Sequence, residues 1–74
     1  MLLIEMNADK VRALREEMCW SRRDFAAAAG LYETTARRAE RWQPVRVKTA
    51  SKIGAAFGIN PRTIAQTVSQ AREA

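Results

Sequence analysis

The segment from Ser21 to Gly30 constrains the fold more than any other part of this sequence, because it carries both a start and a stop signal for one short helix. The hydroxyl of Ser21 can cap the backbone N–H of Asp24, and Trp20 and Phe25 have the spacing of a hydrophobic staple. An alanine run then favours the helix, and Gly30 can take the left-handed conformation that ends it. We therefore expect a helix followed at once by a tight turn.

Apolar residues at helical spacing continue through most of the chain, and strand signals are absent except for a brief Val45-Arg46-Val47. Caps and periodicity predict four further helices: from the cap Asn7 to about Met18, from about Tyr32 to Arg41, from Val47 to Phe57, and from the cap Asn60 onward, with Ile64, Ala65, Val68 and Ala71 on its buried face. The expected fold is therefore a compact, all-α domain of five helices, with residues 1–6 as an N-terminal arm.

Length and composition limit the classes of function. A chain of 74 residues with 47% hydrophobic residues makes one small domain, residues 1–74, that should fold. Its single cysteine, Cys19, and its lack of histidine exclude an internal disulfide and the usual zinc spacings. No residues have the pattern of a catalytic site, so we expect no enzyme, no metal and no cofactor. The apolar start is too short for a membrane span or a signal peptide, which predicts a cytoplasmic protein.

Positive charge is concentrated in one stretch. Residues 37–52 hold six lysines and arginines and one acid, Glu40, and the resulting +5 equals the net charge of the whole chain. These cations are Arg37, Arg38, Arg41, Arg46, Lys48 and Lys52. A local excess of this kind favours an anionic partner such as a nucleic acid.

The order helix, glycine turn, helix over residues 21–41, with the small Ala26 four positions before Gly30, is typical of a helix-turn-helix motif. Five stretches resemble the lambda-repressor-like (Cro or XRE type) family of helix-turn-helix DNA-binding proteins, in the family's order and spacing: 11–17 (VRALREE), 20–26 (WSRRDFA), 29–31 (AGL), 40–41 (ER) and 52–61 (KIGAAFGINP). The resemblance implies a five-helix domain whose helix at about 32–41 enters the major groove of double-stranded DNA.

The resemblance also implies roles for particular residues. The expected base-reading residues are Glu33, Thr34, Arg37 and Arg38, since arginine can bond guanine, glutamate can accept from cytosine, and threonine can touch a thymine methyl. The expected phosphate-binding residues are Arg22, Arg23, Arg41, Gln43, Arg46 and Lys48. Arg15 and Glu40 occupy positions that form an internal ion pair in relatives, so we assign them to architecture.

The sequence departs from the family pattern at four positions. Ala36 and Ala39 replace larger aliphatic residues that pin the recognition helix to the core, and the sequence does not show which side chains supply the missing volume. Tyr32 replaces a small N-cap residue and Trp42 replaces a glycine. Both are open to packing, phosphate contact or a partner.

Two functions are consistent with these features. The first is a transcriptional regulator, expected to be a repressor of phage or mobile-element type, that binds a two-fold symmetric DNA site as a homodimer. Its dimer surface would be the last helix or Leu2-Leu3-Ile4, unless both complete the monomer core. The second is an antitoxin-like protein-interaction module on the same fold, which would bind a protein partner through residues 1–6.

Overall fold

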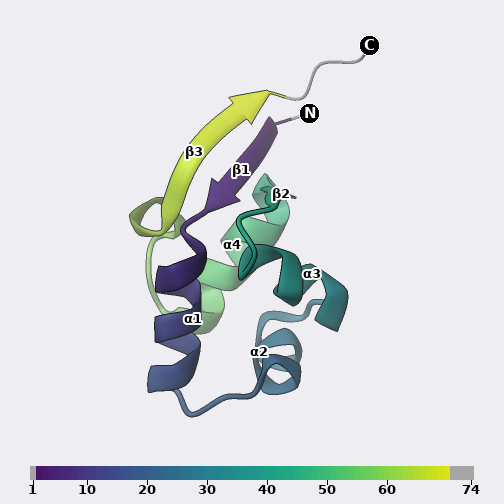
Figure 1. The fold of residues 1–74 in the computed structure, drawn as a ribbon, viewed down its shortest axis with the longest axis vertical. Helices are drawn as coiled ribbons and strands as arrows, with labels where there is room; N and C mark the ends of the chain where they lie inside the picture. The colour runs from purple at the N-terminus through teal and green to yellow at the C-terminus, as the bar shows by residue number, and fades with distance from the viewer. Residues whose placement is uncertain (1, 71–74) are drawn as a thin grey trace.

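The computed structural model describes the backbone of residues 2–70 and the side chains of residues 3–65. Along this part of the chain the elements are β1 (Leu2–Met6), α1 (Ala8–Glu17), α2 (Arg22–Ala29), α3 (Glu33–Ala39), β2 (Pro44–Arg46), α4 (Val47–Phe57), the 3-10 helix η1 (Pro61–Thr63) and β3 (Ala65–Gln70). Figure 1 shows β1 and β3 side by side at one end of the molecule, beyond the helices. The fold therefore combines α-helices with a sheet.

The expectation of an all-α, five-helix domain is wrong. In place of a fifth helix, η1 makes a single turn after the Asn60 cap, and the chain then continues as β3. Residues 2–6 are not a free arm but the strand β1. The periodicity of a short apolar run fits either a helix or a strand. Here the pairing between two distant segments makes both of them strands. Met1 and Ala71, which the predictions also included, lie outside the described residues.

The three strands form one antiparallel sheet in the order β2-β1-β3. The central strand β1 places Ile4 opposite Val45 of β2 and, on its other side, opposite Val68 of β3. The pairing with β3 shifts register between Glu5 and Met6. The sheet therefore joins the N-terminal segment to a segment about sixty residues further along the chain.

The predicted caps of the helices are confirmed. The Asn7 side chain accepts a hydrogen bond from the Lys10 backbone N–H, and Ser21 and Asp24 form a complete capping box at the start of α2. Gly58 ends α4 in the left-handed conformation, directly after the predicted last residue Phe57. These signals act within three or four residues, so the sequence locates them without knowledge of the fold.

The core lies between the helices and the inner face of the sheet. Phe25, Met6, Ile53 and Val11 are its largest fully buried side chains. Trp20 and Phe25, the expected staple pair, both stack on Phe57 of α4, with ring centroids 5.8 Å and 5.1 Å away. Burial of each such large side chain contributes about 1.5–3 kcal/mol. The aromatic stack thus ties the start of α2 to the end of α4.

Within the described backbone, two residues other than glycine adopt the left-handed conformation. Cys19 follows α1 with φ 58°, and Trp42 follows α3 with φ 60°. A side chain in this region costs about 1–2 kcal/mol relative to ordinary geometry. Trp42 thus takes a backbone conformation that glycine adopts at lower cost, and its side chain remains 41% exposed.

Candidate nucleic-acid interface

The turn between α2 and α3 is built by Gly30. Its φ of 68° and ψ of 38° are left-handed, and the N–H groups of Gly30 and Leu31 bond back to the carbonyls of Ala27 and Ala26 at 3.2 Å and 2.8 Å. This is the Schellman arrangement, in which a glycine closes the helix and reverses the chain. The partly buried Leu31 packs against the core just after the turn. The turn fixes where α3 begins.

Two small residues hold α3 against the core. Ala36 and Ala39 are fully buried, and both belong to the same hydrophobic cluster as Phe25 and Val45. Because each side chain is a single methyl group, the α3 backbone can approach this cluster closely. Ala36 and Ala39 are smaller than the aliphatic residues expected at these positions, but they still give α3 a buried face.

The opposite face of α3 is polar and exposed. All four predicted base-reading residues lie on α3, and all four side chains are exposed: Glu33, Thr34, Arg37 and Arg38. They form two rows at a spacing of four residues, Glu33 with Arg37 and Thr34 with Arg38. Among the described residues neither arginine has a carboxylate within ion-pair distance. The helix is shorter than the predicted 32–41, because Tyr32 is its N-cap residue and Glu40 its C-cap residue.

The predicted ion pair between Arg15 and Glu40 lies behind α3. Glu40 is 3% exposed, and the Arg15 Nε and Nη2 groups donate to its two carboxylate oxygens at 2.8 Å and 3.1 Å. Arg15 also donates to the Trp20 carbonyl oxygen at 2.9 Å. The pair therefore connects the end of α1, the start of the α2 region and the end of α3.

Two further arginines approach the same carboxylate. Arg12 of α1 and Arg22 of α2 each place Nε 3.9 Å from Oε1 of Glu40, with side chains about half exposed. Arg12 was not among the predicted site residues, although it stands one turn before Arg15 on the same helix. Arg22, which was predicted to bind phosphate, is thus within ion-pair distance of Glu40. Its exposed neighbour Arg23 forms no ion pair with Glu40.

The remaining predicted phosphate-binding residues lie between α3 and the first turn of α4. Arg41 and Gln43 are exposed in the loop before β2, Arg46 is the N-cap residue of α4, and Lys48 lies in the first turn of that helix. None of the described side chains caps the start of α4, and its first turn contains no acidic residue. The free N–H groups and the helix dipole there add positive potential to that of the side chains.

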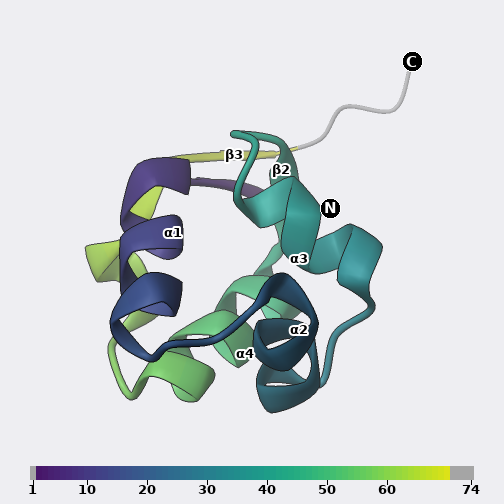
Figure 2. The same ribbon diagram turned by 60° about the horizontal axis from the view of Figure 1, so that its bottom comes forward.

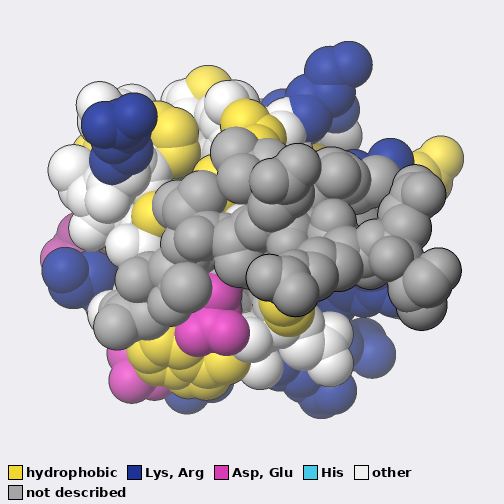
Figure 3. All heavy atoms as spheres, turned by 90° about the horizontal axis from the view of Figure 1, so that it is seen from above, with side chains coloured by type: hydrophobic (Ala, Val, Ile, Leu, Met, Phe, Trp, Pro, Cys, Tyr) yellow, Lys and Arg dark blue, Asp and Glu magenta, His cyan; other side chains and the backbone are white. Residues whose placement is uncertain are grey.

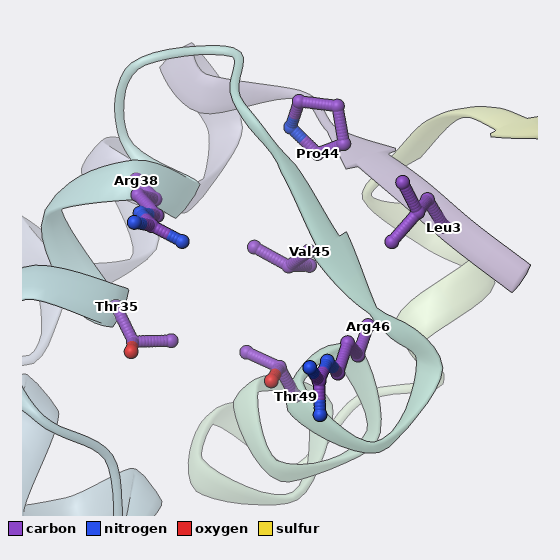
Figure 4. Close-up of a pocket in the computed structure, with 7 residues that line it drawn as sticks. All are labelled: Leu3, Thr35, Arg38, Pro44, Val45, Arg46 and Thr49. Carbon is purple, nitrogen blue, oxygen red and sulfur yellow. The ribbon is translucent and has the colours of Figure 1, made fainter. Parts of the chain in front are cut away.

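A hollow of about 540 Å³ separates α3 from the β2–α4 corner. It is lined by Leu3, Thr35, Arg38, Pro44, Val45, Arg46 and Thr49. In Figure 4, Thr35 and Arg38 approach it from α3, and Val45 points toward them from β2 on the opposite side. Sequence reasoning missed Thr35 and Thr49. Thr35 stands three residues before Arg38, a spacing that places both on one side of a helix, but nothing local connects Thr49 to α3.

Positive charge is not confined to one side of the molecule. Seen from the sheet end, lysine and arginine side chains lie around much of the rim (Figure 3). The arginines between α3 and α4 lack carboxylate partners among the described residues, as Arg23 does, whereas Arg12, Arg15 and Arg22 converge on Glu40. The exposed polar face of α3 beside the start of α4, and not charge alone, therefore defines the candidate surface.

Within residues 2–70, no helix has the length and apolar character needed to cross a bilayer. Comparisons with protein-family models, curated proteins and solved structures found no match to the chain.

Proposed function

We propose that this chain is a sequence-specific, double-stranded-DNA-binding transcriptional regulator that reads the major groove with α3. The observation that carries the proposal is the exposed polar face of α3, whose arginines have no ion pair within the described part of the chain. The left-handed turn at Gly30 presents this face, and buried Ala36 and Ala39 back it. A short helix held on one face by the core and bearing donors and acceptors on the other has the form that the major groove admits.

The side chains of this face have the chemistry of base recognition. Arg37 can donate two hydrogen bonds to guanine, Glu33 can accept from cytosine, and Thr34 can bond a base or touch a thymine methyl. Each well-placed bidentate pair contributes about 1–3 kcal/mol of discrimination. Arg23 at the start of α2 and Lys48 at the start of α4 are candidates for phosphate contacts that orient the helix.

The proposal extends to the oligomeric state and location of the regulator. The regulator is a cytoplasmic repressor that acts as a homodimer on two half-sites about one helical turn, ~34 Å, apart. A single short recognition helix contacts few base pairs, so a second copy supplies the length of site that specificity requires.

The antitoxin-like alternative is less well supported than at the sequence level. It requires residues 1–6 to reach a protein partner, and residues 2–6 are the central strand of the sheet, with the Met6 side chain fully buried. Removing this segment to test partner binding would also remove part of the core.

Selection of bound duplexes from a random-sequence pool tests the proposal. The wild-type protein should enrich a two-fold symmetric site, and Arg37→Ala should relax the preference at one position of each half-site. Lys10→Gln removes one charge from α1, on the other side of the molecule from α3 in Figures 1 and 2, and should leave the preference unchanged. A pool that shows no enrichment at near-physiological salt contradicts the proposal.

A further inference from the structure

The hollow between α3 and the β2–α4 corner has two arginines on opposite walls. Arg38 comes from α3 and Arg46 from the end of β2, and both side chains are exposed (Figure 4). Among the residues that the structure describes, the lining contains no acid, and neither guanidinium forms an ion pair or a side-chain hydrogen bond. Two like charges that share a hollow repel each other, and an anion placed between them lowers that repulsion.

The other lining residues restrict the kind of anion. Thr35 and Thr49 supply hydroxyl donors from the α3 and α4 sides, while Leu3, Pro44 and Val45 form an apolar wall. Planar guanidinium groups bind phosphate oxygens in bidentate fashion, and hydroxyls add further donors. The apolar wall suits a sugar ring, and about 540 Å³ accommodates a phosphate together with an adjoining sugar. These features favour a phosphodiester linkage over a small inorganic anion.

We propose that this hollow holds one backbone phosphodiester of the duplex that α3 reads, and that Arg38 is a phosphate-binding residue together with Arg46. The inference rests on the proposed function, since it takes its ligand from the same DNA. It changes the role expected for Arg38, which the sequence assigned to base reading, and adds Thr35 and Thr49 as hydroxyl donors. Base reading is then left to Glu33, Thr34 and Arg37.

The two roles for Arg38 predict different measurements. Loss of a base contact relaxes the sequence preference at one position, whereas loss of a phosphate contact weakens binding to all sequences and reduces the salt dependence of affinity. Each phosphate contact contributes about 0.9 to the slope of log affinity against log salt.

The first experiment measures this slope for wild-type protein and for Arg38→Gln, Arg46→Gln and the double variant, on the selected duplex and on an unrelated one. We expect each single variant to reduce the slope by about one on both duplexes, with the selected sequence unchanged. Lys10→Gln is the matched control for loss of one charge and should leave the slope near the wild-type value. Because Arg38 and Arg46 are exposed, circular dichroism should show the wild-type helix content in every variant.

The second experiment replaces single phosphates of the selected duplex by neutral methylphosphonates. One position in each half-site should weaken wild-type binding, and the double variant should be insensitive to replacement at that position. Inorganic phosphate, titrated at constant ionic strength, should displace neither duplex at millimolar concentration.

The outcomes separate this inference from the proposed function. If Arg38→Gln changes the selected base at one position and leaves the slope unchanged, the phosphate role is overturned while sequence-specific binding stands. If the wild-type protein selects no site but both variants reduce the slope on any duplex, the phosphate role stands and sequence reading fails. If inorganic phosphate binds tightly and the variants leave DNA binding unchanged, the hollow does not hold a phosphodiester of the duplex, and the inference is overturned.

Discussion

Arg15 and Glu40, 25 positions apart, form a two-pronged ion pair in which the guanidinium bonds both carboxylate oxygens at 2.8 Å and 3.1 Å. The Glu40 side chain is 2% exposed and that of Arg15 is 15% exposed, so both charges are largely removed from water. A buried pair of this kind is not a large source of stability in itself, but loss of one partner leaves the other charge uncompensated. Glu40 also ends α3, so the pair fixes the helix that carries the proposed reading face.

Replacement of Glu40 by alanine should reduce the free energy of unfolding by about 3–5 kcal/mol, because Arg15 would be left buried without its partner. Urea unfolding followed by circular dichroism measures the change. Glu16→Ala, an exposed glutamate on α1, is the control and should alter stability by less than about 0.5 kcal/mol. If Glu40→Ala does not fold, the paired change Arg15→Met with Glu40→Met should restore folding, since an apolar pair often replaces a buried ion pair at little cost. A Glu40→Ala protein as stable as wild type would contradict this account.

The capping box of α2 should make stability depend on pH in the acid range. The Ser21 backbone N–H, donating to the Asp24 carboxylate at 3.0 Å, and then the Ser21 hydroxyl lower the pKa of Asp24 below its ordinary value of 3.8. A lowered folded-state pKa contributes stability that is present above about 3.8 and is lost as the pH falls through the folded value. An NMR titration of the Asp24 carboxyl should give a midpoint below 3.8. In Asp24→Asn this part of the acid-induced loss should disappear, and an unchanged pH profile would exclude the capping box as its cause.

The left-handed turns predict stability changes of opposite sign. Gly30 has φ 68° and a Cβ there would meet nothing within 4 Å, so Gly30→Ala should cost about 1 kcal/mol from backbone strain alone. Cys19 is exposed with φ 58°, and Cys19→Gly should stabilise the fold by about 0.5–1 kcal/mol because it relieves the same strain. Thermal unfolding of both variants under reducing conditions measures the two changes. Changes of the same sign would show that backbone conformation does not determine stability at these turns.

The central strand should be essential to the fold. Met6 is fully buried between the sheet and the helices, so Met6→Ala should cost about 2–5 kcal/mol. Met18→Ala removes the same side chain from a position that is 47% exposed and should cost much less. Chemical denaturation of the two variants provides the comparison. Equal, small effects at both positions would contradict a structural role for the buried Met6 side chain.

The sequence by itself determined the local parts of this protein. Asn7, Ser21, Gly30 and Gly58 mark helix starts and ends through hydrogen bonds and backbone angles that involve only near neighbours, and the structure has them as predicted. The two exposed rows on α3, Glu33 with Arg37 and Thr34 with Arg38, follow from the helical period.

Only the tertiary structure decided the rest. The segments 2–6 and 65–70 carry apolar residues that fit either helix or strand, and they become strands because each supplies the backbone hydrogen-bond partners of the other. The convergence of Arg12 and Arg22 on Glu40, and the hollow that brings Thr35 and Arg38 close to the β2–α4 corner, likewise depend on how distant elements pack. The spacing of neighbouring residues does not predict these contacts, because they form between segments that are distant in the sequence and meet only in the folded chain.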